Sequence, residues 1–89
     1  MKKHFRALND VGIEMNYTVL SYVNREDKSY VIYTNNMPSD NELGVRILVS
    51  EIISEEPFEV KRANYKLEKE ITDEFIMEMI RTGKELKKH

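Results

Sequence analysis

The stretch that decides the fold is Ser29–Ser50, SYVIYTNNMPSDNELGVRILVS, near the middle of this 89-residue chain. Its two ends, Ser29–Thr34 and Val45–Ser50, are rich in the β-branched and aromatic residues that strands favour. Its middle, Asn35–Gly44, collects Asn, Pro, Ser, Asp and Gly, which is typical of a loop. The stretch therefore predicts two strands joined by a polar loop, and the rest of the chain should add strands beside this pair.

The residues before this stretch predict two more strands. Ile13–Val23 is the longest strand candidate, and the charged turn Asn24–Lys28 separates it from Ser29–Thr34. Two strands joined by so short a turn should pair antiparallel. Phe5–Leu8 is a shorter candidate, and the residues after it, Asn9–Gly12, have turn chemistry because Asn, Asp and Gly tolerate positive φ. We expect a hairpin here as well.

Both faces of the central strands carry apolar side chains. In Ser29–Thr34, Val31 and Tyr33 point to one face and Tyr30 and Ile32 to the other. A sheet with one face in water would alternate apolar and polar residues instead. One helix can cover one face only. The other face should therefore be covered by a loop, a terminal segment or a second protein chain.

The last third of the chain predicts an edge and then a helix. Phe58–Ile71 alternates with a slip of one residue, which indicates a bulge or two short strands with a turn near Ala63-Asn64. Thr72 is an N-cap candidate for a helix over 72–82, and Gly83 is placed to end it. The apolar stripe of this helix should consist of Phe75, Ile76, Met79 and Ile80.

Together these elements predict one small α+β domain over residues 1–89. It should hold an antiparallel sheet of four to five strands with one C-terminal helix packed on one face. Apolar residues make up 40% and charged residues 34% of the chain, as in a small globular domain. The chain has no cysteine, which excludes a disulfide framework and fits a reducing compartment. Without a signal peptide or an apolar run of about 20 residues, we expect a cytoplasmic protein that does not contact a membrane.

Charge is distributed unevenly along the chain. Residues 1–6 carry Lys2, Lys3 and Arg6, and the tail 83–89 carries Lys84, Lys87 and Lys88. The whole chain carries −2 and the ends 1–6 and 81–89 carry +3 each, so residues 7–80 carry −8. An acidic body with basic ends repels a polyanion over most of its surface, which argues against nucleic acid as the main partner. We expect the basic arm 1–4 and the tail 83–89 to be mobile.

The titratable residues do not predict a catalytic, cofactor or metal site. The only histidines, His4 and His89, lie near the termini, where a catalytic base would be poorly held. Two groups of carboxylates are candidates for a cation site or an acid pair, but a solvated acidic rim is the simpler interpretation, because their spacing selects no metal. The groups are Glu51, Glu55, Glu56 and Glu59, and Glu68, Glu70, Asp73 and Glu74.

The aromatic residues of the strands are the candidates for partner contacts. Tyrosine is enriched at protein interfaces, and the uncovered sheet face needs an occupant. Base stacking would require basic residues between the aromatics, and few are present. The predicted partner-binding residues are Tyr17, Tyr22, Tyr30, Tyr33, Val45, Ile47 and Val49.

Three segments of the chain, Ser29–Tyr33, Arg46–Ser50 and Leu67–Glu74, have the pattern of a known family. Through them, residues 13–82 resemble the YrzB-like family of small acidic proteins of Bacillota, a family of unknown function. The chain departs from the family at Lys69-Glu70, where the family has Pro, and at Phe75, where it often has Trp. The resemblance implies a bacterial cytoplasmic protein with an α+β fold, and it implies no activity.

The function expected from the sequence is that of a non-catalytic protein-interaction or regulatory module, which binds a protein partner or forms a homodimer. The alternative is a nucleic-acid-binding protein that uses its basic termini. An enzyme built on the Glu51–Glu59 cluster is a third hypothesis, which we rank below the other two.

Overall fold

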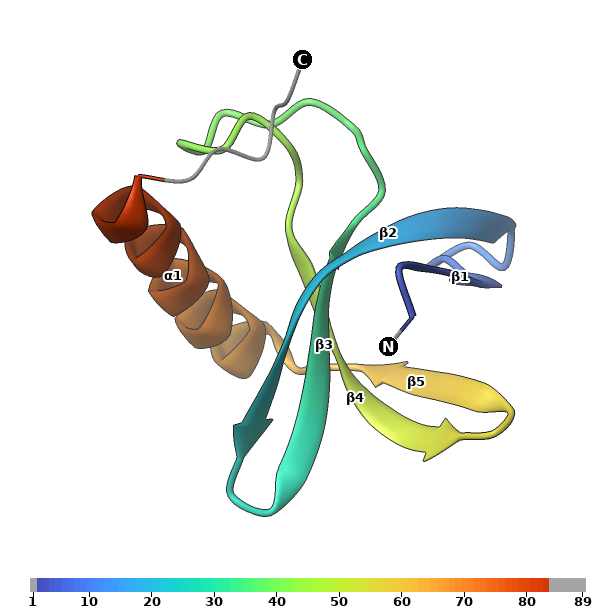
Figure 1. The fold of residues 1–89 in the computed structure, drawn as a ribbon. Helices are drawn as coiled ribbons and strands as arrows, with labels where there is room; N and C mark the ends of the chain where they lie inside the picture. The colour runs from blue at the N-terminus through green and yellow to red at the C-terminus, as the bar shows by residue number, and fades with distance from the viewer. Residues whose placement is uncertain (1, 84–89) are drawn as a thin grey trace.

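The computed structural model describes residues 2–83 and shows an α+β fold, with one five-stranded sheet and one C-terminal helix (Figure 1). The prediction of this fold class is confirmed. The elements are β1 (His4–Leu8), β2 (Glu14–Arg25), β3 (Lys28–Thr34), β4 (Leu48–Glu55), β5 (Phe58–Arg62) and α1 (Tyr65–Thr82).

The sheet is a meander in which each strand pairs antiparallel with the next, in the order β1-β2-β3-β4-β5. Two bulges interrupt the register, one between Val19 and Ser21 in β2 and one between Ile52 and Ser54 in β4. Bulges bend a strand and increase its twist. In Figure 1 the strands cross one another at steep angles, and the sheet is coiled rather than flat.

Coiling brings the two edge strands, β1 and β5, together. Among the described residues no backbone ladder joins them, and side chains close the seam instead. The rings of Phe5 and Phe58 lie 5.3 Å apart, and Asp10 Oδ1 lies 3.6 Å from Arg62 Nη1. Since both contacts join corresponding ends of β1 and β5, the two edges run side by side in the same direction. The sheet is therefore a barrel closed along one seam by side chains alone.

The inner face of this coiled sheet holds an aromatic core. Phe5 contacts the rings of Tyr17, Tyr33 and Phe58, with ring centroids 5.0–5.4 Å apart. Tyr17 and Tyr33 pack edge to face at 4.9 Å, which is a favoured geometry for aromatic pairs. The buried members of this core are Phe5, Tyr17, Val31, Tyr33 and Leu48.

The outer face is covered by α1 and by the loop between β3 and β4. Ile71 of the helix is 1% exposed and Val49 of β4 is fully buried. The buried members of this helix-side core are Tyr30, Ile32, Leu43, Ile47, Val49, Ile71 and Ile76. Both predicted faces thus have a cover. A terminal strand, β1, completes the inner core together with β5, and no second chain is needed to bury it.

The helix begins earlier than the sequence predicts. Asn64, not Thr72, is the N-cap, because its side-chain oxygen accepts a hydrogen bond from the Leu67 amide at 2.8 Å. The alternation seen in Phe58–Ile71 is therefore strand only as far as Arg62. The predicted end is confirmed: Gly83 has a φ of 74°, and its amide donates to a carbonyl of the last turn. Of the predicted stripe, only Ile80 is exposed.

One further boundary differs from the prediction. Strand β4 begins at Leu48 and not at Val45, and Val45 makes an isolated bridge with Pro38 inside the loop. Mobility of the basic N-terminal arm stays a prediction, although two carbonyls of the arm accept hydrogen bonds from β2. The Val19 amide donates to the Lys3 carbonyl at 2.8 Å, and the Tyr22 hydroxyl donates to the Lys2 carbonyl at 3.2 Å. The predicted mobile tail lies outside the described residues from position 84 onward.

Candidate functional site

Most of the predicted partner-binding residues lie inside the protein. The exposed fraction is 8% or less for five of them, so these five present little or no surface to a partner outside the protein. The sequence predicts a surface position for them because it does not show that the sheet coils over one of its own faces. The five are Tyr17, Tyr30, Tyr33, Ile47 and Val49, whereas Tyr22 and Val45 are partly buried.

Among the described residues, five of the eight carboxylates of the predicted acidic rim form ion pairs, and one of them, Glu68, pairs with Arg62. Arg25 pairs with Glu70 and Glu74, Lys28 pairs with Glu51, and Lys69 pairs with Asp73. Within residues 2–83 no group of three or more metal-ligating side chains occurs. The basic N-terminal residues are engaged as well: Lys2 lies over the Phe58 ring, and Arg6 pairs with Glu14. Nucleic-acid binding through the termini stays a prediction, since Lys84, Lys87 and Lys88 lie outside the described residues.

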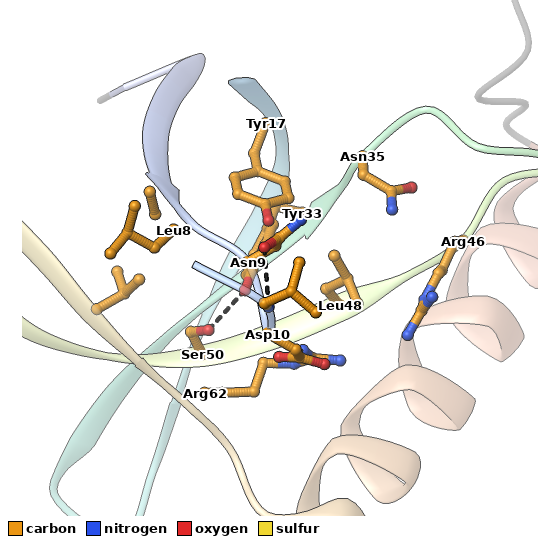
Figure 2. Close-up of a pocket in the computed structure, with 13 residues that line it drawn as sticks. Leu8, Asn9, Asp10, Tyr17, Tyr33, Asn35, Arg46, Leu48, Ser50 and Arg62 are labelled. Carbon is orange, nitrogen blue, oxygen red and sulfur yellow. Dashed lines mark hydrogen bonds and ion pairs between the residues drawn. The ribbon is translucent and has the colours of Figure 1, made fainter. Parts of the chain in front are cut away.

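The structure brings polar groups together at one end of the coiled sheet, where a cavity of about 440 Å³ opens between the strand ends (Figure 2). Every strand or its adjoining turn contributes to this cavity. It is lined by Ala7, Leu8, Asn9, Asp10, Val11, Tyr17, Tyr33, Asn35, Arg46, Leu48, Ser50, Val60 and Arg62.

A pair of buried hydroxyls lies deep in this cavity. Tyr33 Oη and Ser50 Oγ share a hydrogen bond of 2.7 Å, and Ser50 is 1% exposed. Burial raises the pKa of Tyr33 above its usual value, because an ionised phenolate would be poorly solvated there. The hydroxyl pair is therefore neutral at physiological pH and can donate as well as accept hydrogen bonds.

The Tyr17 hydroxyl also faces the cavity. The residue is 6% exposed, and its ring is fixed between Phe5 and Tyr33. This hydroxyl takes part in none of the hydrogen bonds among residues 2–83. In the same range, every side-chain polar atom that is sealed from solvent has a hydrogen-bond partner. The hydroxyl therefore reaches the cavity space, and Figure 2 shows it directed toward Tyr33 and Asn9.

A fixed guanidinium forms part of the wall. Glu68 of α1 accepts hydrogen bonds from Arg62 Nε at 2.8 Å and Nη2 at 3.2 Å. The same carboxylate accepts from the Val49 amide at 2.8 Å. This contact raises the pKa of Arg62 and joins α1 to β4 and β5. The remaining nitrogen, Nη1, faces the exposed carboxylate of Asp10.

Three exposed apolar side chains lie within six residues of sequence at the rim of the cavity, the densest such group among residues 2–83. The exposed fractions of Leu8, Val11 and Ile13 are 68%, 75% and 57%. The turn that presents them is well ordered by hydrogen bonds, since Asn9 Oδ1 accepts from the amides of Val11 and Ile13 at 3.0 and 2.9 Å. We call Leu8, Val11 and Ile13 the hairpin tip. Sequence reasoning missed it, although an apolar residue inside an Asn-Asp-Val-Gly turn is the signal that could have found it.

No family model, no curated protein and no solved structure matches this chain. The resemblance to the YrzB-like family therefore stays a prediction. Among residues 2–83 no helix is both long and apolar enough to cross a membrane.

Proposed function

We propose that this protein is a non-catalytic interaction module whose contact surface is the hairpin tip and the cavity beside it. The observation that carries the proposal is the exposure of three large apolar side chains within six residues. Burying such side chains against a partner is favourable by about 25 cal/mol per Å² of apolar surface. Elsewhere in the described part of the chain, the exposed apolar residues are single ones, such as Ile53, or the pair Met77 and Ile80 one turn apart on α1, and none of them forms a group of three within six residues. Single exposed apolar residues need no explanation.

The shape of the turn supports the same function. An apolar turn held by hydrogen bonds loses little conformational entropy when it docks, because its backbone is already ordered. Asn9 provides this order through its side chain, and Gly12 provides the positive φ of 83° that the turn requires. The occupant we propose is a protein segment, since proteins offer apolar side chains and charged groups in one surface.

Site-specific photo-crosslinking tests this proposal. A benzoylphenylalanine at Val11 should yield one defined adduct in cells, and the same probe at Ile53, which is 53% exposed on β4, should not. The crosslinked protein is then purified and its affinity measured. The double variant Val11→Ser/Ile13→Ser should weaken binding by tenfold or more, about 1.4 kcal/mol, whereas Ile53→Ser should leave it unchanged.

Two outcomes would overturn the proposal. One is equal crosslinking from Val11 and Ile53, which would indicate random collisions. The other is a purified partner whose affinity is insensitive to the hairpin variant. An adduct of twice the chain mass would identify a second copy of this protein as the partner, and the same variants would then be compared by sedimentation equilibrium.

A further inference from the structure

The cavity beside the hairpin tip holds more hydrogen-bond donors than the protein uses. Arg62 has five N–H donors, of which Glu68 takes two. The Tyr17 hydroxyl has no hydrogen-bond partner among residues 2–83, although its residue is more than nine-tenths buried. Arg46 lines the opposite part of the cavity from Leu8 in Figure 2, and no ion pair to it occurs among the described residues.

The charge of the lining favours an anion. Its charged residues are Arg46, Arg62 and Asp10, so the lining carries a net charge of +1. Because Glu68 offsets the charge of Arg62 from outside the lining, the attraction for an anion comes mainly from Arg46. Asp10 forms only a weak ion pair with Arg62, because its side chain is 82% exposed and its Oδ1 lies 3.6 Å from Arg62 Nη1 without a hydrogen bond. Its carboxylate marks the place where another carboxylate could meet the same nitrogen.

Part of the remaining lining is apolar, beside the polar side chains of Asn9, Asn35, Tyr33 and Ser50. Leu8, Val11, Leu48 and Val60 line the cavity between these polar groups. A free inorganic anion would leave this apolar surface in contact with water, whereas a carboxylate on a short hydrocarbon stem covers it. The stem of a glutamate side chain or of a C-terminal residue has this composition.

From this lining we infer that the cavity is a carboxylate-binding subsite, with Arg46, the outer nitrogen of Arg62 and the Tyr17 hydroxyl as its available donors and the apolar part of the wall as the surface for the hydrocarbon stem. The inference rests on the proposed function only for the source of the carboxylate, a segment of the protein docked on the hairpin tip. Guanidinium groups and hydroxyls are the donors that recognise carboxylates elsewhere in proteins.

The test uses butyrate as the probe and the isolated, uniformly ¹⁵N-labelled protein. Butyrate at constant ionic strength should shift the amide signals of Tyr17, Ser50 and Val60 saturably, with a dissociation constant in the millimolar range. Butyramide has the same stem without the charge and should bind about tenfold more weakly or not at all. Inorganic phosphate should shift these signals less than butyrate does. This comparison needs no variant, so it does not depend on any substitution being tolerated.

Four variants then assign the binding. Arg46→Gln and Tyr17→Phe should each weaken butyrate binding about threefold to tenfold. Asp10→Asn should strengthen it about twofold to threefold, because it removes the competing carboxylate. Lys61→Gln is the matched control, since Lys61 precedes Arg62 on β5 and consecutive strand residues point to opposite faces. It removes one positive charge and should change nothing.

Equal binding of butyrate and butyramide, or an equal effect of Lys61→Gln and Arg46→Gln, would overturn the inference. The absence of a saturable shift would do the same. The outcome is separable from that of the proposed function, because Ile13 lies outside the cavity lining. Because Val11 lines the cavity, Ile13→Ser alone separates the two proposals. Butyrate binding with a partner that ignores Ile13→Ser would keep the subsite and remove the hairpin tip as the contact surface.

Discussion

The two faces of the sheet are built from alternate residues of the same strands, yet they are covered in different ways. On the outer face, Ile32 and Val49 pack against Ile71 of the helix, and most of the core is aliphatic. On the inner face, Val31 and Leu48 pack among Phe5, Tyr17 and Tyr33, and most of the contact is aromatic. One face has a separate cover, whereas the other is covered by the sheet itself.

The difference teaches how a short chain can bury two apolar sheet faces with a single helix. A coiled sheet needs side chains long enough to meet across its interior, and aromatic rings meet this need better than valine or alanine. The bulges in β2 and β4 supply the bend. An apolar pattern on both faces of a strand is therefore no proof of a missing partner.

The largest expected effect compares the two cores directly. Ile71→Ala should lower the free energy of unfolding by about 2–5 kcal/mol, and Phe5→Ala should lower it by about 3–5 kcal/mol. Phe5 lies in the five-residue edge strand β1. If Phe5 were not part of a core, its substitution by alanine would hardly change the free energy of unfolding. Urea unfolding measures both values, with Ile53→Ala as the exposed control. A loss below about 0.5 kcal/mol for Phe5→Ala would show that the inner core contributes far less to stability than the helix-side core.

The strand pattern made much of this fold predictable. Alternation and turn chemistry locate β1, β2 and β3, and the glycine after the apolar stripe locates the helix end at Gly83. The helix start was missed because the charged residues after Ala63 look like an edge strand. The signal lay in Asn64 as a cap and in the spacing of Leu67 and Ile71, which is that of one helix face.

The coil of the sheet and the candidate site could not be predicted in the same way. The bulged residue Leu20 continues an ordinary strand pattern, so the first bend leaves no mark in the sequence. The adjacent apolar residues Ile52 and Ile53 indicate a bulge in β4, but they do not show that the sheet coils over its own face. Without the bend, Tyr17 and Tyr33 appear equally suited to a surface or a core. The cavity depends on the coil as well, because it brings Asp10 and Arg62 together across 52 residues of sequence.

The second prediction tests whether Glu68 connects the helix, which covers the outer face, to strands β4 and β5 of the sheet. Glu68→Gln keeps the shape of the side chain but weakens its hydrogen bonds to Arg62 and to the Val49 amide. We expect a loss of about 1–2 kcal/mol, because charged hydrogen bonds are strong but Arg62 is 35% exposed. Thermal or urea unfolding gives the value. Glu78→Gln, on the exposed side of the helix, is the matched control, and a loss no greater than that of the control would contradict the connection.

The third prediction concerns the polar pair in the aromatic core. Tyr33→Phe should cost about 1 kcal/mol near neutral pH, because it removes the hydrogen bond to Ser50. The folded protein holds the phenolic proton of Tyr33 more tightly than the unfolded chain does, since burial raises its pKa. The contribution of Tyr33 to the free energy of unfolding is complete below the pKa of tyrosine in the unfolded chain, about 10. It is lost as the pH rises through the higher pKa of Tyr33 in the folded protein. The difference between wild type and variant should therefore shrink above about pH 10. A constant difference from pH 8 to 11 would contradict this.

The smallest expected effect comes from a change in the turn between β2 and β3, which should stabilise both cores by the same amount. Glu26 and Asp27 form the turn between β2 and β3 with φ values of 53° and 67°, which Asn-Gly adopts with less strain. Glu26→Asn/Asp27→Gly should stabilise the protein by about 0.5–1 kcal/mol. Because β2 and β3 contribute to both cores, the costs of Ile71→Ala and Phe5→Ala should stay the same in this background. Destabilisation by the new turn would show that the observed turn is not strained.

The central claim is that the sheet covers its own inner face within one chain. The most direct measurement is an isotope-filtered NOE experiment on an equal mixture of labelled and unlabelled protein. The structure places the Phe5 and Phe58 rings 5.3 Å apart, so strong NOEs between their ring protons should arise within the chain and persist on dilution. The absence of these NOEs, or their presence only between labelled and unlabelled chains, would contradict the account and return the inner face to a second protein chain.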